Sequence, residues 1–445
     1  MVYKKNRLYW PGKVILMALL TLCIPAVHAQ DSTKQLQLDE AIQMALQQNR
    51  QINLSRKDEQ IARSQYKQTE AIWLPQVNLS YTGFVTNQPL GSFGFKLQQA
   101  QVQQADFNPA TLNNPGSSSN VLTQLNLQQP LYNPDLMYMR KAAAQQVVMY
   151  GFQIQRTNEG IILQVSNTYL QLEFSYEAVK VLQEALTTIQ ETWRFTHDRY
   201  QQGLLQKSDV LNAEVQVKAA ATNIAEARSQ IIILSDQLGL LMNSPKGIVY
   251  KPVPYTLQAA ALATDTFPVD RADIKAMKTA VDVYDLSIKS TKMTMLPKLN
   301  GFANYQFNDK NLFGFGAHSY IAGLQLSWDI FKGNQAKNKM ATQVLEKSKL
   351  VEQIQNNIDQ GTTEIKKAAR QLSDLEFRLS QQSLSVESAA ESFRIIQNRY
   401  SQGLVNTTDM LMVQTQLSQQ QLQYAQTIYL KKTAIVYLQF LTATK

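Results

Sequence analysis

The chain has 445 residues and a formal net charge of +9, enough for two or three domains. Its 17 Gly and 13 Pro gather at a few breaks, and long Gln-rich runs contain neither, a composition typical of long solvated helices rather than of a compact α/β enzyme. Lys and Arg are scattered among acidic residues, so no nucleic-acid-binding patch is expected.

The N-terminus has the parts of a secretory signal peptide. Four basic residues precede an apolar run at 14–24, and Ala26 and Ala29 occupy the −3 and −1 positions of a cleavage site. The run is too short for an ordinary transmembrane helix, although an uncleaved anchor is an alternative. Cleavage after Ala29 removes those four basic residues and no acidic ones, which leaves a mature chain with a net charge of +5.

The single cysteine, Cys23, lies inside this leader. It raises a second alternative, a lipoprotein that begins at a lipidated Cys23, but the bulky Leu22 before it argues against that processing. Without a cysteine the mature chain can form no disulfide, so its stability has to come from packing and oligomerisation.

A first helix is expected at residues 36–72, where an apolar stripe has helical spacing, and Pro75 ends it. Apolar and polar residues then alternate in four stretches of about nine to eleven residues, the length that a tilted strand needs to cross a bilayer. The alternation is that of strands with one face in lipid and one in a lumen. The four strands are expected at 77–85, 121–129, 299–307 and 320–330. A loop-like insertion at 86–120, with a short helix expected at 96–105, separates the first two strands.

Four strands cannot close a membrane barrel, because an open edge in lipid leaves backbone groups unpaired. If they span a membrane, the barrel must be shared, and two, three or four chains would give 8, 12 or 16 strands. Two half-buried hairpins on a soluble domain are the alternative.

Two very long helices are expected at 134–200 and 334–400, with return helices after 209 and at 409–442. The first would be about 100 Å long. Its apolar residues and those of its return recur every seven positions, as in a coiled coil. The repeating residues are Val165, Leu172, Val179, Leu186 and Trp193, then Val210, Val217, Ile224, Ile231 and Leu238.

The turn between each long helix and its return has the same sequence pattern. RYQQGLLQKSD at 199–209 is repeated as RYSQGLVNTTD at 399–409. Gly203 and Gly403 suit the positive φ that ends a helix. Ser208-Asp209 and Thr408-Asp409 suit the start of the next helix, as cap and first-turn anion.

These landmarks recur in the same order, which predicts a duplicated chain that is mainly α with membrane β-strands. The predicted parts are a signal peptide (1–29), a first repeat of helix, two strands and long hairpin (30–242), a proline-rich linker (243–272) and a second repeat (273–445).

The leader, the duplicated halves, the Leu-Pro before each first strand and the RYxxGLxxxxDxL at each tip resemble the TolC family of outer-membrane efflux proteins. LDEAIQMALQQN near the mature N-terminus and the R-x-D of Arg271 to Asp273 are also similar to that family. The resemblance covers nearly all of the mature chain. It implies a homotrimer in the outer membrane, with a 12-stranded β-barrel, and an α-barrel of helices that extends into the periplasm.

The function implied is a passive exit duct of a tripartite efflux or type I secretion system. A periplasmic adaptor would join the duct to an inner-membrane pump of RND or ABC type. Outer-membrane lipid is the other partner, and no cofactor or nucleic acid is implied.

The resemblance also implies roles at the tips: Gly203, Leu204, Gly403 and Leu404 would contact the adaptor, and Asp409 would narrow the tunnel. Asp209 and Tyr400 are further candidates for the channel constriction. The alternatives are a helix-start charge for Asp209 and Asp409 and plain packing for Tyr400. Two positions depart from the family pattern: Met412 replaces a second acidic residue, and Val405 replaces a basic one.

Two other functions are open to a chain of this composition. An enzyme is disfavoured, because the only mature histidines are His197 and His318, and no metal-ligand cluster, phosphate loop or GxSxG motif is present. A structural or adhesive coiled-coil rod anchored in the outer membrane is the main alternative. The sequence does not name the cargo.

Overall fold

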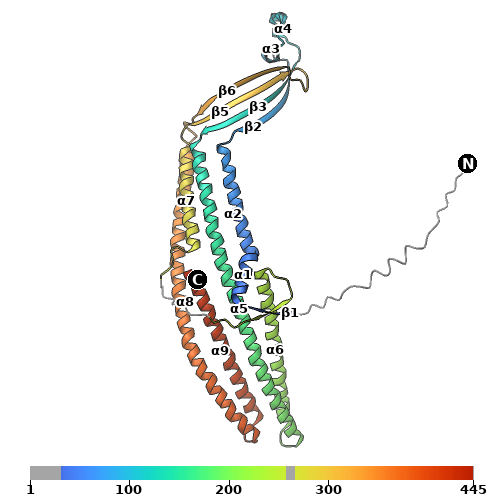
Figure 1. The fold of residues 1–445 in the computed structure, drawn as a ribbon, viewed down its shortest axis with the longest axis vertical. Helices are drawn as coiled ribbons and strands as arrows, with labels where there is room; N and C mark the ends of the chain where they lie inside the picture. Colours follow the sequence, from blue (N-terminus) through green and yellow to red (C-terminus); the bar gives the residue numbers. More distant parts are fainter. Residues whose placement is uncertain (1–31, 257–265, 444–445) are drawn as a thin grey trace, which may run out of the picture.

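The structure, a computed structural model, describes residues 32–256 and 266–443. The predicted signal peptide and Cys23 lie outside these residues. Helical hairpins run from one end of an elongated molecule toward a sheet near the other end (Figure 1). None of the helices in the described ranges is long and apolar enough to cross a membrane.

Helix α5 (Pro134–Gln201) has 68 residues and α8 (Gln335–Ser401) has 67, so each is about 100 Å long. Helix α5 continues through Gly151 and Gly160. Its return is α6 (Lys207–Met242), and the return of α8 is α9 (Thr407–Thr442). Both long hairpins are therefore confirmed.

The predicted heptad positions form much of the core between these helices. Val165 and Leu172 of α5 and Leu238 of α6 are fully buried, together with Tyr169. Nearer the tips, Leu186 and Trp193 pack against a second buried cluster, which includes Ala213.

The predicted helix at 36–72 is wrong as a single element. It consists of α1 (Leu38–Gln48), α2 (Arg50–Gln68) and a 3-10 turn, η1 (Thr69–Ile72). Asn49 breaks it with extended backbone, and its side-chain oxygen accepts hydrogen bonds from the N–H groups of Gln51 and Ile52. A local cap therefore outweighs the continuous apolar stripe.

Beside the helices, β1 (Ser32–Leu36) pairs in parallel with β4 (Ile248–Pro252). Neither strand was predicted, and β4 lies inside the predicted linker. The Tyr169 hydroxyl lies 2.8 Å from the carbonyl oxygens of both Leu36 and Val253, which fastens this small sheet to α5. Burial raises the pKa of Tyr169 to about 12.

The main sheet has the antiparallel order β2-β3-β5-β6. Its register gives two chemically different faces. Leu79, Leu125, Tyr305 and Tyr320 lie side by side on one face and are exposed, whereas Ser80, Gln124, Gln306 and Ser319 lie side by side on the other. The strands are β2 (Gln76–Thr86), β3 (Ser118–Tyr132), β5 (Lys298–Asp309) and β6 (Ala317–Ser327).

The fourth strand ends earlier than the predicted 330. The indole N–H of Trp328 donates to the Met295 carbonyl at 2.9 Å, and Gly333 and Asn334 then turn the chain with positive φ into α8. Helix α7 (Ala272–Met293) precedes β5 and packs against α5 and α8.

The insertion between β2 and β3 folds into α3 (Pro89–Gln98), a 3-10 turn η2 (Gln104–Phe107) and α4 (Pro109–Asn113). The helix predicted at 96–105 is therefore wrong in its bounds: Pro89 starts α3 at its first turn, and Ala100 has positive φ just after its end. These elements lie at the end of the sheet that is far from the hairpins (Figure 1).

Candidate functional site

The two hairpin tips have the same backbone geometry. Gly203 and Gly403 have φ of +79° and +76°, as predicted. At each tip the glycine N–H donates to the carbonyl of Tyr200 or Tyr400, and the N–H of the next residue donates to the carbonyl five positions earlier. This is the Schellman arrangement that closes a helix C-terminus.

The cap residues predicted for the return helices are wrong. Helices α6 and α9 start before Ser208 and Thr408, and their N-cap residues are Gln206 and Asn406. The Asn406 side chain accepts a hydrogen bond from the Asp409 N–H at 2.8 Å. The Asp209 carboxylate accepts one from the Gln206 N–H at 3.2 Å.

Asp209 and Asp409 both lie in the first turn of their helices, as predicted. A negative charge there is stabilised by the helix dipole. The Asp209 carboxylate also completes the helix start, whereas the Asp409 carboxylate has no hydrogen-bond partner among the described residues. Asp409 is therefore the freer of the two anions.

Tyr400 forms a buried hydroxyl cluster between the two hairpins. Its ring is 6% exposed and stands 5.0 Å from the Phe195 ring, measured between centroids. Its hydroxyl oxygen lies 2.8 Å from Thr196 Oγ1 and 3.2 Å from Thr407 Oγ1. Because Thr196 is on α5 and Thr407 begins α9, this cluster joins the first hairpin to the second.

Arg199 reinforces the same junction from α5. Its guanidinium lies over the Phe195 ring and its Nη2 donates to the Ser401 carbonyl at 3.5 Å. A Cβ built on Gly403 would stand 2.7 Å from Arg199 Nη1, so the arginine packs directly on the second tip. The glycine there is needed for its φ and for this close approach.

The outer surface of each tip is apolar at one residue. Leu204 and Leu404 are 66% and 64% exposed, although each donates its own N–H to the turn that ends the helix. The adaptor contact predicted for these two leucines stays a prediction.

The structure brings Tyr400 into contact with Thr196 and Thr407, which sequence reasoning did not select. Thr407 lies in the repeated motif, but its counterpart in the first copy is Lys207, so the comparison of copies gave no signal. Thr196 lies outside the motif. The constriction roles of Asp409, Asp209 and Tyr400 concern an assembly of several chains and stay predictions.

No group of three or more His, Cys, Asp or Glu side chains in ranges 32–256 and 266–443 is placed to hold a metal ion.

The chain thus combines two long helical hairpins that have similar tips with a four-stranded sheet that has one apolar face. The chain belongs to the outer membrane efflux protein family, whose model matches residues 41–244 and 269–444. It is thus an outer-membrane efflux protein that extends into the periplasm.

Solved membrane proteins share this fold. A membrane protein from Pseudomonas aeruginosa superposes with a TM-score of 0.77 at 18% identity, over 91% of this chain and 92% of that one. The CmeC outer membrane channel of Campylobacter jejuni superposes with a TM-score of 0.76 at 16% identity, over 91% of this chain and 85% of that one. The outer membrane protein VceC of Vibrio cholerae superposes with a TM-score of 0.73 at 17% identity, over 91% of this chain and 95% of that one. The comparison with curated proteins gave no match.

Proposed function

We propose that three copies of this chain form the exit duct of a tripartite efflux or type I secretion system. The duct conducts substrates passively from an inner-membrane pump of RND or ABC type, through a periplasmic adaptor, to the outside. The proposal keeps the division of the chain into repeats at 30–242 and 273–445. The observation that carries it is the two-faced sheet with open edges.

The edges of the sheet are β2 and β6, which run in opposite directions because each of the three pairings is antiparallel. Strand β6 of one copy can therefore pair with β2 of the next in an antiparallel barrel. In lipid such edges have to be paired. Three copies would give 12 strands, with the Leu79 row toward lipid and the Ser80 row toward the lumen.

The helices supply the periplasmic part. Helices α5 and α8 span about 100 Å each, enough to carry a tunnel well away from the membrane. Large apolar side chains are exposed along α6 and α8, which a neighbouring copy would cover in a ring. They include Leu211, Val215, Ile232, Leu240, Leu345, Phe377 and Leu384.

The tips are the place for the adaptor. Gly203-Leu204 and Gly403-Leu404 present two similar rigid turns, each with an exposed leucine. An adaptor that binds one turn can bind the other with the same chemistry. Three copies would offer six such turns.

Disulfide cross-linking tests the ring. Cys23 precedes the predicted cleavage site, so introduced cysteines would be the only thiols of the mature chain. Leu79→Cys on β2 is combined in turn with Tyr320→Cys, Ala322→Cys or Leu324→Cys, which lie on the same face of β6. Ile321→Cys and Gly323→Cys, which lie on the other face, are the controls.

In oxidised outer membranes, a variant with both cysteines on the same face should give cross-linked dimers and trimers and no larger species. The control variants should give no cross-link. Bands beyond three chains would indicate a larger ring. No cross-link from any same-face pair, in protein shown to be folded and inserted, would contradict closure through β2 and β6.

A further inference from the structure

The insertion between β2 and β3 has no counterpart in the second half, where residues 310–316 connect β5 to β6. It forms a cap that leans on the polar face of the sheet. The Phe84 and Phe95 rings stand 6.0 Å apart, and Gln99 Nε2 donates to Asn120 Oδ1 at 2.9 Å. Phe84 pairs with Asn120 in the register, on the face that carries Ser80 and Gln124. The cap therefore stands at the far end of the proposed lumen.

A buried amide chain holds the cap in place. Gln99 Nε2 also donates to the Ser119 carbonyl, and Asn120 Nδ2 donates to Asn308 Oδ1 on β5 at 2.8 Å. Gln99, Asn120 and Asn308 are 7%, 1% and 2% exposed. Buried networks of this kind fix one arrangement, so the cap is a built structure rather than a loose loop.

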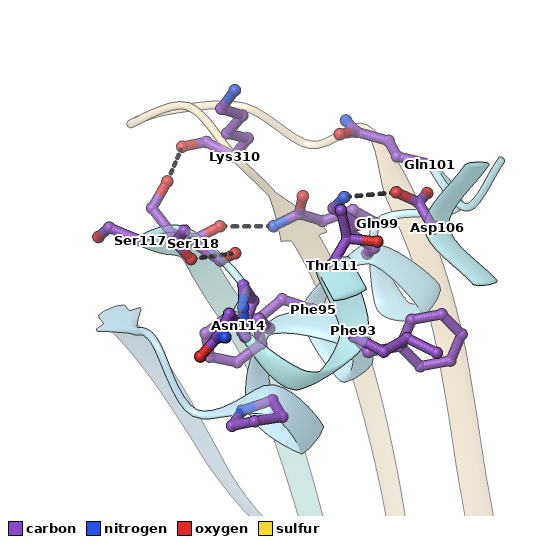
Figure 2. Close-up of a pocket in the computed structure, with 17 residues that line it drawn as sticks. Phe93, Phe95, Gln99, Gln101, Asp106, Thr111, Asn114, Ser117, Ser118 and Lys310 are labelled. Atoms are coloured by element: carbon purple, nitrogen blue, oxygen red, sulfur yellow. Dashed lines mark hydrogen bonds and ion pairs between the residues drawn. The ribbon is translucent and has the colours of Figure 1, made fainter. Parts of the chain in front are cut away.

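The cap forms a half-open cavity of about 320 Å³ (Figure 2). Phe93 and Phe95 contribute apolar ring surface to its wall. Lys96 and Asp106 also line it and are paired at 2.6 Å, and hydrogen bonds from Lys96 and from the Gln103 N–H lower the pKa of Asp106. Lys310 is the remaining cation and stands exposed at the rim.

Several neutral polar groups in this wall have no partner among residues 32–256 and 266–443. Gln99 is more than nine-tenths buried, yet its Oε1 accepts no hydrogen bond from the described residues. The side chains of Gln101, Asn114 and Ser117 also have no partner within the described part of the chain, but they are exposed and water can serve them, so Gln99 Oε1 is the buried unpartnered atom of this wall. Amides and hydroxyls placed around a cavity without partners are available to a ligand.

We propose that this cavity binds a saccharide at the outer surface of the membrane. The wall combines ring faces, which contact the C–H side of a sugar, with neutral amides and hydroxyls, which match its hydroxyl groups. One unpaired lysine is too little for a polyanion, and a lining that mixes polar and apolar groups fits a ligand with both kinds of surface better than a wholly apolar one. A cavity of this volume is at the small end of ligand sites, so it takes one or two sugar rings.

The same sugar chemistry can come from an outer-leaflet glycolipid or from a free oligosaccharide. The proposal depends on the outer-membrane location and on the cap, but not on conduction or on the number of copies.

The test is saturation-transfer NMR with the full mature protein in detergent. The probes are methyl glucoside, methyl galactoside, methyl N-acetylglucosaminide and the oligosaccharide released from lipopolysaccharide. Whole lipopolysaccharide in phosphatidylethanolamine vesicles, against vesicles without it, separates the membrane source from the free one. Both Asn113 and Asn114 are exposed, but only Asn114 lines the cavity, so Asn114→Ala removes one wall amide and Asn113→Ala is the matched control.

We expect binding of at least one saccharide, weakened about fivefold to tenfold by Asn114→Ala and unchanged by Asn113→Ala. No transfer to any probe at millimolar concentration would overturn the proposal. Equal weakening by both variants, or displacement by inorganic phosphate alone, would also overturn it. Single-channel conductance of the same preparation reports separately on the proposed duct.

Discussion

The hydroxyl cluster at Tyr400 gives the sharpest prediction about the tips. Thr196 Oγ1 donates its hydrogen to the Thr192 carbonyl at 2.7 Å. It can then only accept from the Tyr400 hydroxyl, which in turn accepts from Thr407. Tyr400→Phe keeps the ring against Phe195 and removes both hydrogen bonds.

The free-energy cost of Tyr400→Phe follows from the burial of its two hydrogen-bond partners. Thr196 and Thr407 are 0% and 2% exposed, so each would lose a partner away from water. At about 1 kcal/mol for each hydrogen bond, the junction between the hairpins loses about 2 kcal/mol. If the cluster exists only when the tips are together, the ratio of closed to open tips falls about thirtyfold.

The assay is open probability in single-channel recordings, with hydrogen exchange of the first turns of α9 as a structural readout. Tyr200→Phe is the matched control, because Tyr200 occupies the same place in the first tip but is 38% exposed and its hydroxyl has no partner among the described residues. Equal behaviour of the two variants, or no change in either, would refute the junction as a closing contact.

Three further predictions concern single residues. Gly403→Ala should destabilise its tip by about 1–2 kcal/mol, because alanine is strained at positive φ, and the added Cβ should also displace Arg199. In Gly203→Ala the added Cβ meets open space, so hydrogen exchange at the tip should rise more in Gly403→Ala than in Gly203→Ala. Burial would raise the pKa of Asp273, but hydrogen bonds from Arg271 hold it below its usual value. The resulting stabilisation is fully present above the pKa of Asp273 in the unfolded chain and is lost as the pH falls through its lower pKa in the folded chain. Asp273→Asn should therefore lower the melting temperature at pH 7 and make the melting temperature fall less steeply toward acid pH. A melting temperature that falls as steeply in the variant as in the wild type would contradict this. Asp409→Ala should remove the cation preference of the conductance if three carboxylates ring the lumen, whereas an unchanged preference would limit Asp409 to its helix.

Sequence patterns were sufficient to predict the elements in which one periodicity continues over many residues. The heptads of α5 and α6 and the glycine turns at 203 and 403 were confirmed, since each depends on local geometry. The helix break at Asn49 was missed because it needs a side-chain cap that an apolar stripe conceals. Strand β4 was missed because it is short and becomes a strand only by pairing with distant β1.

The site shows the same division. The tip residues could be found because the two copies repeat them, but the partners of Tyr400 could not, since Thr196 has no repeated counterpart and lies beside Tyr400 only through packing between hairpins. The cap cavity also depends on contacts far apart in the chain, such as Asn120 with Asn308.

The central claim is that the assembled chains enclose a conducting path. The most direct measurement is single-channel conductance of the purified mature protein in a planar bilayer, recorded beside Tyr400→Phe. We predict steady conductance steps, with longer open times in the variant. A folded, inserted assembly that never conducts, in either form and with adaptor added, would contradict the duct and favour a structural rod.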